Sequence, residues 1–94
     1  MARAIWRGQT IAESDDTVVV EGNYYFPRSA LDDSLVRESS RTSLCPWKGT
    51  ASYYSLEAYG VTSADAVWFY PEPTPGAESV RDRVAFWKDV EVQP

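Results

Sequence analysis

Turn-forming residues interrupt this chain at short and fairly even intervals, and this spacing constrains the fold more than any other feature. The breaks lie at Gly8, Asp15-Asp16, Gly22-Asn23, Pro27, Pro46, Gly49, Gly60, the segment Pro71–Gly76 and Asp89. The segments between them are rich in Val, Tyr, Trp and Phe, which favour strands. Short strands separated by turn signals are typical of an all-β sandwich or barrel. We therefore predict a mainly β fold in a single domain over residues 1–94.

The predicted strands cover Arg3–Arg7, Thr10–Glu13, Thr17–Glu21, Tyr24–Phe26, Leu35–Glu38, Thr50–Tyr59, Val67–Tyr70, Val84–Trp87 and Val90–Gln93. Gly8-Gln9 predicts a two-residue hairpin turn of the primed type, with glycine first, and Asp15-Asp16 predicts a second tight turn. Apolar side chains on both faces of Val18–Val20 indicate a strand covered on both sides. The same pattern holds for the strand that ends at Tyr70.

Two short helices are predicted between these strands. Arg28–Asp33 follows Pro27 and is long enough for about one turn. Ala77–Arg83 follows Thr74-Pro75, which supplies a capping residue and then a proline at the first helical position.

The composition of the chain excludes or disfavours several classes of functional site. The chain of 94 residues has 9 basic and 14 acidic residues, a net charge of −5, one Cys and no His. The basic residues are scattered along the chain, which disfavours binding to nucleic acid or to an anionic membrane. Without His there is no Ser-His-Asp triad and no histidine zinc site, and one Cys makes neither an internal disulfide nor a thiolate zinc cluster.

We expect a cytoplasmic protein. A lone Cys suits a reducing compartment. The first residues carry Arg3 and Arg7 where a signal peptide would be apolar, so we predict no signal peptide. The longest apolar stretch, Ala66–Tyr70, is far shorter than the ~20 residues that a membrane span needs.

The segment Ser43–Gly49 brings several chemically different side chains together within seven residues. It contains the only Cys, a rigid Pro, a Trp and a Lys, and it falls between two predicted strands. A thiol near Lys48 and Arg41 ionises more readily, which a nucleophilic or redox Cys45 would need. The competing interpretation is a small buried thiol in a turn, because free Cys is often buried. Cys45 and Lys48 are therefore the candidate catalytic residues.

Aromatic residues form a large set at Tyr24-Tyr25-Phe26, Tyr53-Tyr54 and Trp68-Phe69-Tyr70. Tyr and Trp combine an apolar body with a polar tip, which suits the wall of a ligand pocket. The alternative is that they are the core of a small β protein.

Asp89 and Glu91 would share one face of a strand, and two such carboxylates can hold Mg²⁺. The pattern is common by chance, and an ordinary solvated face explains it equally. No glycine-rich phosphate-binding loop is present.

The sequence resembles the family known as domain of unknown function 427, which also carries a nucleotidyltransferase-type name. The resemblance lies in Val20–Pro27, Ser43–Tyr54, Ala66–Pro71 and Val84–Phe86, in this order. It implies an Mss4-like, or β-tent, fold of two small antiparallel sheets with a cleft near their open end. Zinc-binding relatives of that fold use two Cys-x-x-Cys pairs, which this chain lacks, so neither zinc nor another cofactor is expected.

The leading hypothesis is a binding module for a small molecule or a peptide. Its cleft would lie around the Cys45–Gly49 loop and use Tyr25, Phe26, Arg41, Ser43, Cys45, Trp47, Lys48, Tyr53 and Tyr70. Lys48 would attract an anionic or polar group, the Tyr hydroxyls would orient the ligand and Trp47 would cover it. The alternatives are a Cys45-dependent enzyme and a metal-dependent nucleotidyltransferase using Asp89 and Glu91. A homodimer through an edge strand, Arg3–Arg7 or Val90–Gln93, is a further possibility.

Overall fold

A computed structural model describes all residues from 1 to 94, mainly as strands. The strands are β1 (Ala2–Trp6), β2 (Gln9–Ser14), β3 (Val18–Val20), β4 (Asn23–Pro27), β5 (Val36–Cys45), β6 (Gly49–Ala58), β7 (Val61–Phe69), β8 (Arg83–Phe86) and β9 (Val90–Gln93). Three short 3₁₀ helices connect some of them: η1 (Arg28–Ala30), η2 (Asp33–Leu35) and η3 (Pro75–Val80). The predicted mainly β fold is confirmed.

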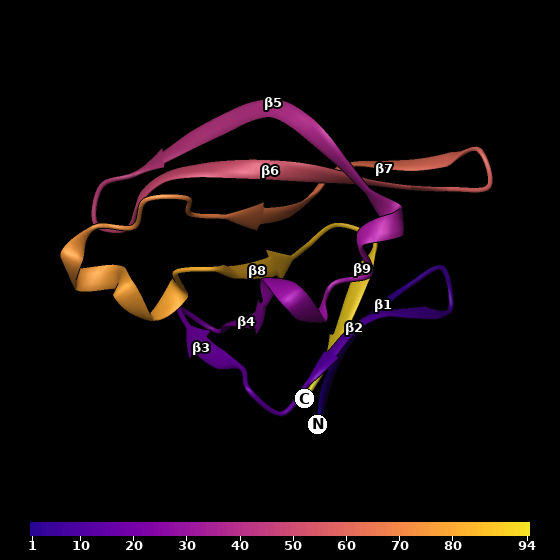
Figure 1. Cartoon of the computed structure of the whole chain (residues 1–94), viewed down its shortest axis with the longest axis horizontal. Coiled ribbons are helices and arrows are strands. Elements are labelled where there is room, and N and C mark those ends of the chain that lie inside the picture. The colour runs from indigo at the N-terminus through magenta and orange to yellow at the C-terminus, as the bar shows by residue number, and fades with distance from the viewer.

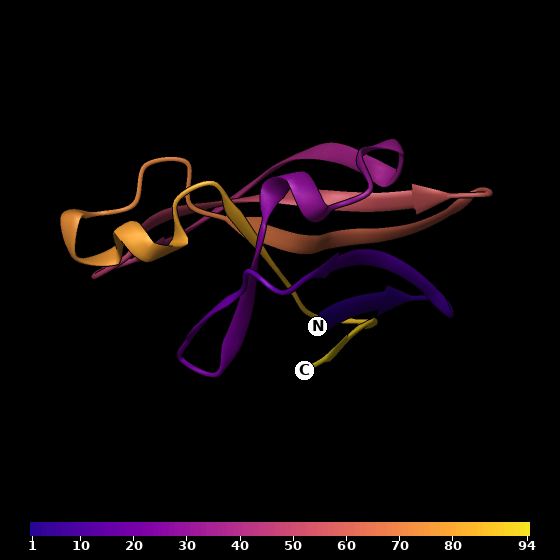
Figure 2. The same ribbon diagram turned by 60° about the horizontal axis from the view of Figure 1, so that its bottom comes forward.

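The strands form two antiparallel sheets, and Figure 1 shows how they are arranged. The larger sheet has six strands in the order β3-β4-β8-β7-β6-β5, and the smaller has three in the order β2-β1-β9. In the turned view of Figure 2, the small sheet lies below one face of the large sheet.

The two predicted edge strands differ in their pairing. The segment Arg3–Arg7 is not an edge strand, because β1 pairs with a neighbour on both sides. Val90–Gln93 does lie at an edge.

Three hairpins turn through two residues that both have positive φ, ending in Gly. Arg7-Gly8, Glu21-Gly22 and Tyr59-Gly60 have φ values of 52° and 78°, 55° and 80°, and 52° and 76°. This is the type I′ conformation, which matches the twist of the flanking strands and requires positive φ at both positions. The first turn is therefore Arg7-Gly8 and not Gly8-Gln9, and glycine is second. Asp15-Asp16 forms no hairpin, because β2 and β3 belong to different sheets.

Two strands are much longer than the sequence predicts. Strand β5 continues from Val36 to Cys45, although only Leu35–Glu38 is predicted. Its second half is polar and exposed at an edge of the sheet, so no apolar alternation marks it. Strand β7 starts at Val61 and not at Val67, since the Tyr59-Gly60 turn folds it directly back on β6.

The predicted helices form only as 3₁₀ turns. Arg28–Asp33 is split into η1 and the start of η2, and Ala77–Arg83 is replaced by η3, which begins at Pro75 after Thr74 as the proline signal indicates. A kink at Ala77 interrupts η3, with φ of −121°. No helix of the chain combines the length and apolar character that crossing a membrane would require.

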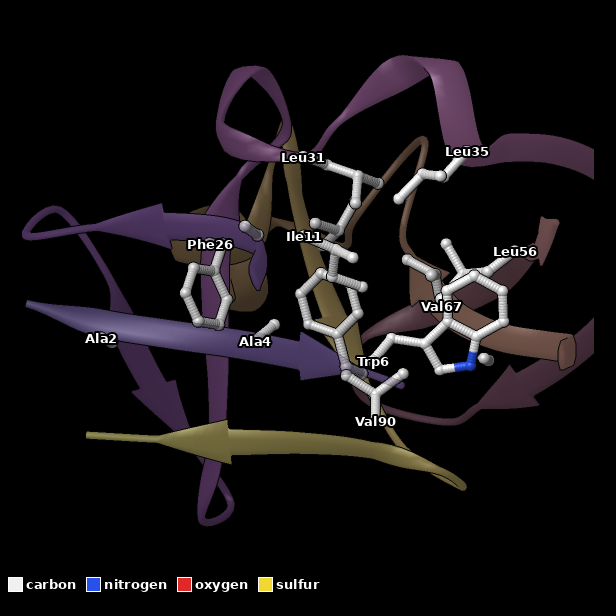
Figure 3. Close-up of a cluster of buried hydrophobic side chains, with 14 residues drawn as sticks. Ala2, Ala4, Trp6, Ile11, Phe26, Leu31, Leu35, Leu56, Val67 and Val90 are labelled. Atoms are coloured by element: carbon white, nitrogen blue, oxygen red, sulfur yellow. The ribbon is translucent and has the colours of Figure 1, made fainter. Parts of the chain in front are cut away.

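The main core lies between the two sheets. Fourteen buried residues form it, from Ala2, Ala4 and Trp6 of β1 to Leu56, Val67 and Val84 of the large sheet. Figure 3 shows these side chains between the layers, with Trp6 beside Leu56 and Val67 and with Leu31 beside Ile11. Phe26 and Phe86 pack edge to face within it, with ring centroids 5.5 Å apart.

The other face of the large sheet carries a second, smaller cluster. Along β8, Val84 and Phe86 point into the main core, while Ala85 between them belongs to the second cluster. This cluster has seven buried residues, Tyr25, Ala51, Tyr53, Tyr70, Ala77, Val80 and Ala85, of which Ala77 and Val80 come from η3. Helix η3 covers part of this face. Strand β3 is not covered on both sides, since Val19 is 56 % exposed.

Candidate functional site

An open hollow lies on the second face of the large sheet, beside the part that η3 covers. It has a volume of about 210 Å³ and is lined by Lys48, Tyr53, Trp68, Tyr70 and Trp87. We call it the aromatic hollow.

The sheet register brings the aromatic residues of the hollow together. Tyr53 of β6 lies directly opposite Trp68 of β7. Tyr70 comes directly after β7 and two residues after Trp68, and alternation along an extended chain places it on the same face as Trp68. Trp87 comes directly after β8 and meets Trp68 edge to face, with ring centroids 6.2 Å apart. The β-rich segments therefore provide a rigid wall for the hollow.

Three of the aromatic side chains of this wall already have hydrogen-bond partners behind or beside it. The indole of Trp68 donates a hydrogen bond of 3.1 Å to the hydroxyl of Tyr25, which is fully buried behind it. The hydroxyls of Tyr53 and Ser43 are 2.8 Å apart. The indole of Trp87 donates to the backbone carbonyl of Asp65 at 2.6 Å. These bonds fix the ring orientations, so the shape of the hollow does not depend on a ligand.

Arg41 of β5 lies over two of the rings. Its guanidinium carbon is 5.0 Å from the ring centre of Tyr53 and 5.5 Å from that of Trp87, within the range of a cation–π contact. Its only ion pair is a long one, 3.8 Å to Asp65, and the side chain is 45 % exposed. A guanidinium this loosely paired can accept a further anionic partner.

Lys48 is buried, with only 5 % of its surface exposed. Its ammonium donates a hydrogen bond to the carboxylate of Glu21 and lies 5.4 Å from the ring centres of both Tyr70 and Trp47. Burial by itself lowers the pKa of Lys48, but the bond to Glu21 and the nearby Tyr25 and Tyr70 raise it above its usual value. Lys48 is therefore a fixed cation with a committed partner.

Glu21 stands at the type I′ turn between β3 and β4 and receives two donors. Besides Lys48, the indole of Trp47 donates to it at 3.3 Å. The bond from Lys48, and then that from Trp47, lower the pKa of Glu21. The β3–β4 hairpin is thus fastened to the loop between β5 and β6, although the two are far apart in sequence.

The Cys45–Gly49 loop is held on its other side by the segment before η3. The amide of Thr74 donates to the carbonyl of Lys48 at 3.1 Å, and the Thr74 hydroxyl donates to the carbonyl of Trp47. Gly49 has φ of +114°, and a Cβ there would be 3.1 Å from the carbonyl oxygen of Glu72. Gly49 is needed both for its backbone conformation and for this close approach.

Three of the predicted site residues, Lys48, Tyr53 and Tyr70, line the hollow. Three others support these walls without lining them: Tyr25, Arg41 and Ser43. Cys45 is half-buried and packs against the second cluster. Trp47 is 46 % exposed and contacts Glu21. Phe26 points to the opposite face of the sheet and belongs to the main core.

The predicted set omits two lining residues, Trp68 and Trp87. The first could have been found, because Trp68 shares a strand face with Tyr70, which the set includes. The second could not, because Trp87 reaches the hollow only through the pairing of β7 with β8.

The residues of the two enzyme hypotheses have other partners. No hydrogen bond or ion pair joins Cys45 to Lys48, whose ammonium is bonded to Glu21. Asp89 accepts hydrogen bonds from Trp6, at 3.0 Å, and from Ser63. The bond from Ser63, and then that from Trp6, lower the pKa of Asp89. Glu91 accepts instead from Gln93 at 2.7 Å, so the two carboxylates do not act as a pair.

A family model described as domain of unknown function (DUF427), with the label NTP_transf_9, matches residues 1–93, and the chain belongs to this family. No curated protein matches the chain.

Proposed function

We propose that this DUF427 protein is a binding module whose aromatic hollow receives an aromatic ring carrying a carboxylate. The ligand would be either a free aromatic acid or the C-terminal aromatic residue of a peptide, because both have the same ring and carboxylate. The observation that carries the proposal is the convergence of Tyr53, Trp68, Tyr70 and Trp87 on one hollow, with Arg41 over two of the rings.

The size of the hollow sets the size of the ligand. Pockets for drug-sized molecules usually measure about 300–1,000 Å³. A hollow of about 210 Å³ is smaller, and suits a single ring with a short side chain. Flat walls of Tyr and Trp favour a planar group, because offset and edge-to-face contacts between rings are attractive.

The charges around the hollow favour an acid. The ammonium of Lys48 already has Glu21, whereas Arg41 has only the 3.8 Å contact with Asp65. A guanidinium binds a carboxylate through two parallel hydrogen bonds, which Lys cannot do. We therefore assign the carboxylate to Arg41 and the ring to the hollow.

The four Trp indoles give a direct test by NMR, because each N–H has a different partner. Trp6 donates to Asp89, Trp47 to Glu21, Trp68 to Tyr25 and Trp87 to the carbonyl of Asp65. On titration with 3-phenylpropionate, the indole signals of Trp68 and Trp87 should shift while that of Trp6, in the main core, stays in place. Gly-Gly-Phe with a free C-terminus tests the peptide source in the same way.

Neutral analogues and paired variants test the role of Arg41. 3-Phenylpropionamide and the amidated peptide should bind about tenfold more weakly, since a charge-assisted bond contributes about 1.4 kcal/mol or more. Arg41→Gln should produce a similar loss for the acids. Arg37→Gln is the matched control, because Arg37 is an exposed arginine of the same strand paired with Glu57. The proposal fails if neither acid moves the Trp68 and Trp87 signals at millimolar concentration.

Cys45 has no part in this function. Cys45→Ser keeps the size of the side chain and should leave binding of 3-phenylpropionate unchanged. Loss of an activity in this variant with binding intact would instead favour the Cys45-dependent enzyme.

A further inference from the structure

A second hollow, away from the aromatic one, is surrounded by three arginines. Arg28, Arg81 and Arg83 line it together with Pro27, Ser29 and Asp82, and its volume is about 560 Å³. The pairing of β4 with β8 brings these residues together: Pro27 lies opposite Arg83, and the amide of Arg28 donates to the carbonyl of Asp82 at 2.9 Å. A chain with a net charge of −5 thus places three of its nine basic residues around one hollow.

A hollow of about 290 Å³ adjoins it and shares the charged residues Arg28, Asp82 and Arg83. Its other walls include Tyr54, Phe69 and Val84. The rings of Tyr54 and Phe69 are stacked, with centroids 4.4 Å apart, and the guanidinium of Arg28 lies 5.1 Å from the centre of Tyr54. We call the two hollows together the arginine groove. Arg28 and Arg83 line both of its ends, Arg81 lines only the first, and the apolar side chains line only the second, which we call the apolar end.

We propose that the arginine groove binds a phosphate monoester that carries an aromatic ring. The ring would lie against Phe69 and Pro71, and the phosphate would lie among the three guanidinium groups. A phosphate has enough oxygens for several two-pronged contacts with arginine, whereas a carboxylate can occupy only one guanidinium in this way. This site is independent of the aromatic hollow, because the two share no lining residue.

The arginines already have carboxylate partners, but these are exchangeable. Arg28 pairs with Asp33, Arg81 with Glu78 and Arg83 with Asp16, and the three carboxylate side chains are between 55 % and 81 % exposed. Ion pairs of this kind contribute little to stability. Arg83 is held more firmly, since it also donates to the backbone carbonyls of Asp16 and Tyr25 at 2.6 and 3.4 Å. The groove thus has one fixed guanidinium, Arg83, and two that can change partner.

Asp82 lines both hollows and opposes binding of an anion. Substitutions at the neighbouring residues Arg81 and Asp82 should therefore change the affinity for an anion in opposite directions. Arg81→Gln removes a positive charge from the groove, and Asp82→Asn removes a negative one. Asp82 has φ of +58°, a conformation that Asn adopts readily, so its substitution keeps the backbone.

The experiment is a titration with phenyl phosphate, followed by amide NMR, with inorganic phosphate and phenol as separate probes. Phenyl phosphate should shift the amides of residues 81–83 and Phe69, and it should bind more tightly than either probe alone. Arg81→Gln should weaken its binding about fivefold, as expected for one exposed charge contact of about 1 kcal/mol. Asp82→Asn should strengthen it by a similar factor. Arg3→Gln is the matched control, since it breaks an equally exposed pair with Glu13 on the small sheet and should change nothing.

Four results would overturn the proposal. One is the absence of shifts near residues 81–83 at millimolar phenyl phosphate. Another is equal binding by wild type, Arg81→Gln and Asp82→Asn. The third is a set of shifts confined to residues of the aromatic hollow, which would mean that phenyl phosphate binds there and not in the arginine groove. Binding of inorganic phosphate as tight as that of phenyl phosphate would remove the role of the apolar end and so contradict the assigned ligand class.

Discussion

The two faces of the six-stranded sheet are built for different purposes. The core between this sheet and the small one has fourteen buried residues, which come from both sheets and from the segment between β4 and β5 and are mostly Ala, Val, Leu, Ile and Phe. The cluster on the other face has seven, three of them tyrosines, and η3 covers that face only in part. Its polar tips are hydrogen-bonded among themselves, as between Trp68 and Tyr25 and between Tyr53 and Ser43. The first face therefore supplies most of the stability, and the second carries a hollow with fixed walls.

This difference shows how a chain of 94 residues can form a hollow whose walls are held by its own hydrogen bonds. A short chain buries only about two thirds of its unfolded surface, so it cannot cover both faces of a six-stranded sheet completely. The uncovered face must remain compatible with water, which Tyr and Trp achieve with their polar tips. Substitutions that separate stability from binding can test this division.

The largest expected effect is that of Leu56→Ala on the main core. Leu56 is fully buried, and its truncation should lower the free energy of unfolding by about 2–5 kcal/mol. Trp87→Ala, on the other face, should cost less, because Trp87 is 38 % exposed, yet it should abolish binding of 3-phenylpropionate. Urea unfolding measures the first quantity and the NMR titration the second. Equal losses of stability would mean that both faces serve as core.

Two neighbouring residues on opposite faces give the next test. Phe26→Tyr would place a hydroxyl in the main core, where an unpaired hydroxyl costs about 1–3 kcal/mol. Tyr25→Phe removes the acceptor of the Trp68 indole and should cost about 1 kcal/mol. Tyr25→Phe should also shift the Trp68 indole signal, and Phe26→Tyr should not. If both variants are neutral in urea unfolding, the two faces do not differ in polarity as described.

The local pattern of the sequence predicts much of the fold, but not its pairing. Turn residues and β-rich segments locate most strands, because local propensity and alternation are properties of neighbouring residues. The second half of β5 escapes this reasoning, since an exposed edge strand needs no apolar alternation. The glycine signal predicts the first turn one residue too late, at Gly8-Gln9. The turn is Arg7-Gly8, and its first position has positive φ although it is not Gly, so no residue signal marks it.

The candidate site follows the same division. The Cys45–Gly49 loop and the tyrosines could be selected from residue chemistry, and Lys48, Tyr53 and Tyr70 do line the hollow. The partner of Lys48 could not be predicted, because Glu21 lies in another hairpin and meets it only in the folded chain. The arginine groove was missed for the same reason. Arg28, Arg81 and Arg83 read as scattered charges until β4 pairs with β8.

A smaller effect is expected at the loop that borders the hollow. Gly49→Ala should destabilise the protein by about 1–2 kcal/mol, because Ala is strained at positive φ and its Cβ would crowd the Glu72 carbonyl. Gly76→Ala is the control, since its Cβ would meet no atom within 4 Å. Thermal unfolding compares the two. A Gly49→Ala variant as stable as Gly76→Ala would mean that the loop is not held against the segment before η3.

The smallest effect is expected from the ion pair that fastens the β3–β4 hairpin to this loop. The pKa of Glu21 is lowered in the folded state, so its carboxylate stabilises the protein above its ordinary pKa of 4.5, and this contribution is lost as the pH falls through the folded value. The pKa of Lys48 is raised, so its contribution persists to high pH. Glu21→Gln should therefore lower the Tm slightly at pH 7, and the difference from wild type should shrink steadily as the pH falls below 4.5 toward the lowered folded pKa of Glu21. Glu13→Gln, which breaks the exposed pair with Arg3, should change the Tm less at pH 7. If the Glu21→Gln difference is the same at every pH down to acid unfolding, the carboxylate charge is not what holds the hairpin, and packing of Trp47 against the turn must do so.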